Sequence, residues 1–159
     1  MSASDCYFCR RLAEMDALPT GEVVWKFPHS VAFLGSWQYY HGYCVLVAQT
    51  HAVELNDLPD AERRAYLDEM CLLAKAVESF ARSHKLNYEM LGNQVRHLHW
   101  HIFPRSTQDP DVLKPVWLAL DRAERDPELR RRYESGSTDR PTTAAELRRI
   151  LHSLGASTS

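Results

Sequence analysis

The 159-residue sequence contains no apolar run that approaches the roughly 20 residues of a membrane-spanning helix. Its first part, residues 1–16, is interrupted by charged residues and cysteine, so it does not resemble a signal peptide. Only four cysteines are present, and only one pair is close in sequence. In a chain that shows no export signal, this cysteine usage favours a reducing compartment, and we expect a cytoplasmic protein without a membrane partner.

An excess of charge is also lacking. The 19 basic and 21 acidic residues leave a net charge of -2, so there is no global positive field for a nucleic acid polymer. A local basic site remains open. The apolar fraction of 45% and the charged fraction of 25% are those of an ordinary soluble domain. No internal repeat is visible.

Hydrophobic periodicity and turn residues predict five strands and two helices in the first two thirds of the chain. A long amphipathic helix begins near Pro59, has Tyr66 and Val77 on its apolar face, and ends at residues 85–87. A short helix is expected at 10–15. The predicted strands are 22–27, 31–34, 43–47, 88–91 and 97–105.

After Arg105 the composition changes, because Pro110 and Pro115 interrupt regular structure. Helix-start signals follow at residues 126–127 and, with capping-box spacing, at 143–146. Gly155 is a plausible helix stop. We therefore expect one domain at residues 1–105 and a helical extension at 106–159 that packs on the same domain.

Three histidines, His97, His99 and His101, alternate with apolar residues in the last predicted strand. Because side chains alternate between the faces of a strand, their imidazoles should share one face at spacings of roughly 6.5–7 Å. Leu98 and Trp100 would then face the core. This alternation indicates a chemical site, since imidazole is suited to proton and phosphoryl transfer near neutral pH.

Two chemistries fit such a row of rings. Two or three imidazoles can chelate zinc, which would activate water. Alternatively, His99 can attack phosphorus if an acceptor holds its other ring nitrogen and nearby donors stabilise the transferred group. Arg105 and the turn at residues 92–93 could supply positive potential for a phosphate. A half-exposed strand whose histidines merely face solvent is the third reading.

A second motif, Cys6-x-x-Cys9, is half of a structural zinc site. No second such pair exists, so the remaining ligands would be histidines, and His51 and His97 are best placed. The alternative is a pair of reduced cysteines on a mobile N-terminus. Cys44 and Cys71 fall within apolar patterns and are interpreted as small buried hydrophobic residues.

The run His97-Leu98-His99-Trp100-His101-Ile102-Phe103 resembles the signature of the histidine triad (HIT) family. The N-terminal Cys-x-x-Cys resembles that of zinc-containing branches. The segment 42–51 is similar to the family's third strand, and the long helix lies where the family has one. Residues 88–93, followed by the triad, resemble a bacterial branch often labelled as dinucleoside polyphosphate hydrolases.

The resemblance implies an α+β, HIT-like fold with a five-stranded antiparallel sheet and a homodimer. Substrates would be nucleotides that carry a group on the α-phosphate, including dinucleoside polyphosphates and nucleoside phosphoramidates. His99 would attack the α-phosphorus, and His101 would contact the phosphate and assist proton transfer. His97 would be a ligand of structural zinc together with Cys6, Cys9 and His51.

The sequence also departs from the resemblance. Better-known branches carry a Gly-His pair on the third strand, where this chain has Gly42-Tyr43. It has Gly35-Ser36 in the region where those branches have a ribose-binding acid or amide. Asn93 and Gln94 stand where the family has a Gln-Ser/Thr pair, and are expected to contact substrate with Arg105.

These departures motivate an alternative hypothesis, a nucleotide-binding protein without turnover. A further hypothesis, a zinc hydrolase that uses all three triad histidines as ligands, needs no nucleotide. Trp117 of the extension either contacts the site or anchors the extension by burial.

Overall fold

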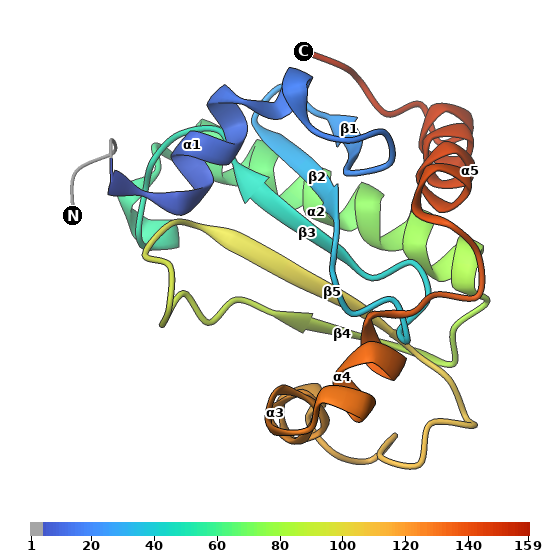
Figure 1. Cartoon of the computed structure of the whole chain (residues 1–159). Helices are drawn as coiled ribbons and strands as arrows, with labels where there is room; N and C mark the ends of the chain where they lie inside the picture. Colours follow the sequence, from blue (N-terminus) through green and yellow to red (C-terminus); the bar gives the residue numbers. More distant parts are fainter. Residues whose placement is uncertain (1–4) are drawn as a thin grey trace.

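The computed structural model describes residues 5–159, and its centre is one five-stranded antiparallel sheet (Figure 1). The strand order is β1-β2-β3-β5-β4, so the last strand in sequence lies between the third and the fourth. This confirms the expected α+β fold with an antiparallel five-stranded sheet. The strands are β1 (Val23–Lys26), β2 (Ser30–Leu34), β3 (Cys44–Ala48), β4 (Lys85–Glu89) and β5 (His99–Arg105).

Seven helices accompany the sheet in the described residues. The longest, α2, covers one face of the sheet, and α1 lies against the other face (Figure 1). The α-helices are α1 (Tyr7–Ala13), α2 (Asp60–Ala81), α3 (Val116–Arg125), α4 (Pro127–Glu134) and α5 (Arg140–Ser153), and the 3₁₀ helices are η2 (Met15–Ala17) and η3 (Leu55–Asp57). None of the helices within residues 5–159 is both long and apolar enough to span a membrane.

The sheet is covered on both faces because its central strands are apolar on both sides. All five residues of β2 are buried. On one face, Leu46 and Ile102 pack with Tyr66, Leu73 and other residues of α2 in the main core. On the opposite face, a smaller cluster joins strand residues to Phe8 of α1. The buried Tyr66 and Val77 confirm the predicted apolar face of the long helix.

The end of α2 differs from the prediction. The helix ends at Ala81, and Arg82 follows in the left-handed conformation with φ 48°. Residues 85–87, predicted as the end of the helix, belong instead to β4, which therefore begins three residues earlier than the predicted strand at 88. The turn was missed because arginine is not one of the residue types, such as glycine or asparagine, that favour a left-handed backbone.

The C-terminal segment contributes to the fold in two parts. Helices α3 and α4 pack together, and Asp126 caps α4 as predicted, since its side chain accepts hydrogen bonds from the next turn. Helix α5 packs on α2 and β1 (Figure 1). Its Leu147 and Leu151 are buried in the main core. The predicted capping box at residues 143–146 is wrong, because Asp139 caps α5 and Thr143 lies inside the helix.

Candidate functional site

Two of the three triad histidines lie on one face of β5. His99 pairs with Val47 of β3, and His101 pairs with Val45, so their rings stand side by side with centroids 4.9 Å apart. Trp100 and Ile102 pack with the main core on the opposite face. The alternation predicted for this part of the chain is therefore correct.

His97 lies just outside the strand, because β5 begins at His99. The prediction that the strand includes His97 is therefore wrong. The ring of His97 nevertheless lies on the same side as that of His99, because Phe8 contacts both rings and Leu98 between them packs in the main core. The amide of Ala48 donates to the carbonyl of Leu98, which continues the pairing of β3 with β5, and the amide of Leu98 donates to the carbonyl of Ala52 beyond β3. The buried ring of His97 also belongs to a separate group of residues.

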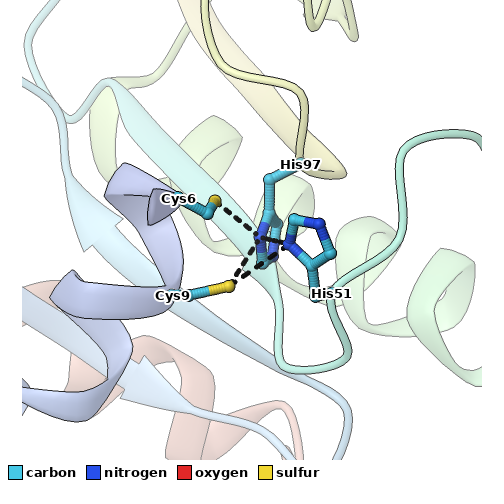
Figure 2. A group of neighbouring side chains, drawn as sticks. All are labelled: Cys6, Cys9, His51 and His97. Carbon is cyan, nitrogen blue, oxygen red and sulfur yellow. Dashed lines mark hydrogen bonds between the residues drawn. The ribbon is translucent and has the colours of Figure 1, made fainter. Parts of the chain in front are cut away.

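That group consists of Cys6, Cys9, His51 and His97, whose ligand atoms all lie within 4.8 Å of one another (Figure 2). Cys6 and Cys9 come from the start of α1, whereas His51 follows β3. The Nδ1 atoms of the two histidines are 3.2 Å apart. Sγ of Cys9 lies 3.2 Å from Nδ1 of His51 and 3.5 Å from Nδ1 of His97.

These separations match a tetrahedral metal site. Zinc–nitrogen bonds of about 2.05 Å and zinc–sulfur bonds of about 2.3 Å place two nitrogens roughly 3.4 Å apart, and sulfur and nitrogen roughly 3.6 Å apart. The observed distances are within a few tenths of an ångström of these values, including 3.4 Å from Sγ of Cys6 to Nδ1 of His97. The four residues thus form a Cys₂His₂ set whose donors converge on one point.

The surroundings of the cluster also suit a cation. Nε2 of His97 donates to the carbonyl of Ala48 at 2.8 Å, which leaves Nδ1 unprotonated in the neutral ring and directed at the cluster. Burial and the neighbouring Cys6 raise the pKa of the Cys9 thiol to about 11. A thiolate at Cys9 therefore requires a positive charge nearby, which a metal ion would supply.

His99 is held on both sides. Its Nδ1 donates to the backbone carbonyl of His97 at 2.6 Å, so Nε2 carries the lone pair of the neutral ring. The Phe8 ring lies 4.7 Å from the His99 ring, and His99 is only 6% exposed. Burial lowers the pKa of His99, which keeps the ring neutral and nucleophilic at physiological pH.

His101 contacts a residue just before β3 and a residue of α3. Its Nδ1 lies 2.6 Å from the hydroxyl of Tyr43, and the ring meets Trp117 edge to face at 5.0 Å. Burial is the main cause that lowers the pKa of His101 to about 3, and the nearby His99 lowers it further. Trp117 is part of a cluster with Phe103, so it both contacts the site and anchors α3.

The three predicted substrate contacts lie in different surroundings. Asn93 and Gln94 are exposed on the loop between β4 and β5, and Asn93 shares a hollow of about 260 Å³ with His97. Arg105 is buried, and its guanidinium binds Asp109 at 2.7 Å. Arg105 also donates hydrogen bonds to Asn87 and to the carbonyls of residues 111 and 114. These bonds hold the loop after β5, so the guanidinium is not directed into the site.

Sequence reasoning named Tyr43 only as a departure from the family and not as a site residue, and it missed Phe8. Tyr43 shares a face with Val45 by simple alternation, and Phe8 lies between two cluster cysteines, so both carried a usable signal. For the other cysteines, burial of Cys44 is confirmed. The prediction for Cys71 is wrong, because this residue lies on the solvent face of α2.

Comparison with known proteins relates this geometry to other chains. The model of the HIT domain matches residues 19–108, which is more than half of the chain. An uncharacterised HIT-like protein of Methanocaldococcus jannaschii is 28% identical over 121 residues, covering 69% of this chain and 85% of that protein. The protein named hit of Bacillus subtilis is 28% identical over 120 residues, with coverage of 72% and 80%.

A solved structure extends the likeness to nearly the whole chain. The zinc-bound histidine triad family protein of Mycobacterium smegmatis superposes with a TM-score of 0.66 at 18% identity, covering 97% of this chain and 98% of that one. At this identity the likeness concerns the fold. The match of the domain model over residues 19–108, which contain the whole triad, shows that this chain belongs to the HIT family.

Proposed function

We propose that this protein is a nucleotidyl hydrolase or transferase that acts at the α-phosphate of a nucleotide conjugate. The conjugate would be a dinucleoside polyphosphate or a nucleoside phosphoramidate. The intermediate would be a nucleotide joined through its α-phosphorus to Nε2 of His99. Membership of the HIT family supports nucleotide chemistry in general, and the residues around His99 support this particular mechanism.

The observation that carries the proposal is the 2.6 Å hydrogen bond from Nδ1 of His99 to the carbonyl of His97. This bond orients the ring and leaves the lone pair on Nε2. When Nε2 attacks phosphorus, the ring gains positive charge. The carbonyl dipole is already in place to stabilise that charge through the Nδ1–H bond.

The first step forms the bond between Nε2 and phosphorus and breaks the bond between phosphorus and the leaving group. The leaving group departs with the electron pair of that bond. A polyphosphate needs no proton to do so near neutral pH, whereas the nitrogen of a phosphoramidate takes a proton from water as the phosphorus–nitrogen bond breaks. In the second step, water adds to phosphorus and releases a proton to solvent. The Nε2–phosphorus bond then breaks, which restores neutral His99.

His101 would act in both steps as a neutral hydrogen-bond donor. Its pKa of about 3 means that it carries no positive charge at pH 7. Because Nδ1 faces Tyr43, Nε2 is the nitrogen directed at the phosphate. A donor fixed beside His99 would stabilise the negative charge that grows on the phosphoryl oxygens in the transition state.

Cys6, Cys9, His51 and His97 would hold a structural zinc ion. A zinc ion with four protein ligands has no open position for water or substrate, so it contributes stability to the fold and not a reactive hydroxide. The remaining predictions belong to the same proposal. We expect Asn93 and Gln94 to contact substrate, a cytoplasmic homodimer, and a domain at residues 1–105 on which residues 106–159 pack.

Two alternatives differ in what they require. A hydrolase with metal on all three triad histidines is disfavoured, because the ring of His97 lies in the cysteine cluster and Nδ1 of His99 binds a carbonyl. A nucleotide-binding protein without turnover is favoured by one observation, the 6% exposure of His99. That alternative predicts nucleotide affinity that persists in His99→Ala and no covalent intermediate.

Intact-protein mass spectrometry after brief, acid-free quenching tests the proposal. The zinc-loaded protein is mixed with a panel of dinucleoside polyphosphates and adenosine phosphoramidate, and His99→Ala is treated in parallel. We expect a nucleoside monophosphate adduct on the wild type alone. Product formation by His99→Ala at the wild-type rate would overturn the mechanism, and nucleotide binding without adduct or product would support the alternative.

A further inference from the structure

Tyr43, immediately before β3, lies against the site from the neighbouring strand. Its side chain is fully buried, and its ring stacks on Phe103 with centroids 3.9 Å apart. The hydroxyl reaches Nδ1 of His101 at 2.6 Å. Ring stacking and burial hold the Tyr43 ring in the orientation that directs its hydroxyl at His101.

Space for this ring comes from Gly35, which directly follows β2. The amide of Gly35 donates to the carbonyl of Tyr43 at 2.9 Å, so the two residues are cross-strand neighbours. A Cβ built on Gly35 would lie 2.1 Å from Cε1 of Tyr43 and 2.2 Å from Cδ1. Any residue other than glycine at position 35 would therefore collide with the tyrosine ring, which makes the two residues interdependent.

The phenol of Tyr43 is assigned as the donor, because both groups are neutral and a buried hydroxyl that only accepted would leave its own hydrogen unpaired. Burial raises the pKa of Tyr43 well above 10, so the phenol keeps its proton. Burial lowers the pKa of His101, so its ring is neutral. A neutral ring has one nitrogen that accepts and one that donates. If the phenol donates to Nδ1, the hydrogen of the imidazole must be on Nε2.

We propose that Tyr43 is a positioning residue that fixes His101 as the Nε2–H tautomer, and that Gly35 is needed to admit its ring. His101 then presents a hydrogen-bond donor beside His99 and not a lone pair. The catalytic consequence rests on the proposed function, whereas the tautomer does not. The proposal therefore has one test that needs no substrate.

The test uses long-range ¹H–¹⁵N NMR of the imidazole rings in the zinc-loaded protein, which distinguishes the two tautomers. We expect a single Nε2–H form of His101 in the wild type. Tyr43→Phe keeps the ring and removes only the hydroxyl, so both tautomers of His101 should be populated. The ¹⁵N chemical shifts of Nδ1 and Nε2 should then move toward each other. Tyr40→Phe is the matched control, because it also removes a buried tyrosine hydroxyl. Unlike that of Tyr43, the Tyr40 hydroxyl has no hydrogen-bond partner among the described residues.

Kinetics provide the second measurement. Tyr43→Phe should lower kcat about 10- to 100-fold with KM changed by less than about threefold, because the orienting bond and not the substrate contact is lost. Tyr40→Phe should leave both constants near the wild-type values. A wild-type Nδ1–H tautomer, or unchanged His101 signals in Tyr43→Phe, would overturn the proposal. If the wild type turns over no nucleotide, the proposed function fails, and the NMR result still decides the role of Tyr43.

Discussion

The backbone carbonyl of His97 accepts a hydrogen bond from His99, while the ring of His97 lies in the Cys₂His₂ cluster. One residue thus belongs to two sites at once. A change in the cluster that shifts the backbone of His97 also moves the acceptor of His99. The stability of the cluster and the orientation of the proposed nucleophile should therefore be linked.

The first prediction concerns this link. Cys9→Ser should reduce bound zinc and lower the melting temperature together, since binding of a structural metal contributes directly to folding. It should also lower turnover, because His97 would no longer hold its carbonyl in place. Elemental analysis, thermal unfolding and a turnover assay measure the three effects.

Cys71→Ser is the matched control, because Cys71 is an exposed cysteine of α2 outside the cluster. This variant should keep the wild-type zinc content, melting temperature and turnover. Full zinc occupancy in Cys9→Ser would contradict the assignment of the four ligands. Lost zinc with wild-type turnover would contradict the link to His99 alone.

The second prediction concerns the close approach of Gly35 and Tyr43. Gly35→Ala should lower the free energy of unfolding by about 1–3 kcal/mol, because the added methyl group overlaps the tyrosine ring. In a Tyr43→Ala background the same substitution should cost much less. Urea unfolding of the four proteins gives the coupling energy. Equal costs of Gly35→Ala in both backgrounds would show that the two residues do not depend on each other.

The third prediction concerns Arg105, which stands in the interior with only 2% exposure. Arg105→Met should cost about 3–5 kcal/mol, because it leaves the buried carboxylate of Asp109 without its partner. The exposed pair of Arg125 and Asp121 provides the control, with side-chain exposures of 77% and 55%. Arg125→Met should change stability by no more than about 1 kcal/mol. Equal effects in urea unfolding would refute the structural role of Arg105.

The fourth prediction concerns pH. The pKa of His101 is about 3 in the fold, against about 6.5 in an unfolded chain. Between these values the unfolded chain binds the proton more readily, so stability is fully present above pH 6.5 and is lost as the pH falls toward 3. One such group gives a slope of about 1.4 kcal/mol per pH unit.

His101→Gln should therefore show a shallower fall in the free energy of unfolding between pH 6 and pH 4 than the wild type. The lowered pKa values of His97 and His99 act in the same direction in both proteins. Acid release of any bound metal also affects both alike, so the difference isolates His101. His152→Gln, at an exposed position of α5, is the control variant. Parallel curves for wild type and His101→Gln would contradict the pKa of about 3.

Much of this arrangement could be predicted from local sequence patterns. Strand alternation placed His99 and His101 on one face, and the four cluster residues follow from the Cys-x-x-Cys motif and the positions of His51 and His97. These features depend on spacing within short segments and on ligand chemistry. Both are visible in a single chain without knowledge of its packing.

The features that could not be predicted depend on contacts between distant segments. Arg105 is directed away from a phosphate-binding role by its hydrogen bonds to Asp109 and to Asn87 of β4. The residues next to Arg105 in the sequence do not indicate these partners. The interdependence of Gly35 and Tyr43 is a cross-strand relationship that appears only once β2 and β3 are aligned. Cys71 was misplaced because a residue on the border of a helix's apolar stripe can face either way.

Helix α5 has a consequence for the order of events during synthesis. Its Leu147 and Leu151 complete a core that also contains Val24 of β1 and Leu73 of α2. The ribosome makes β1 more than a hundred residues before these leucines. The part of the apolar surface that α5 covers therefore stays exposed until residue 151 has left the ribosome. A chain stalled within α4 would expose that surface, which makes such a nascent chain a natural client for chaperones.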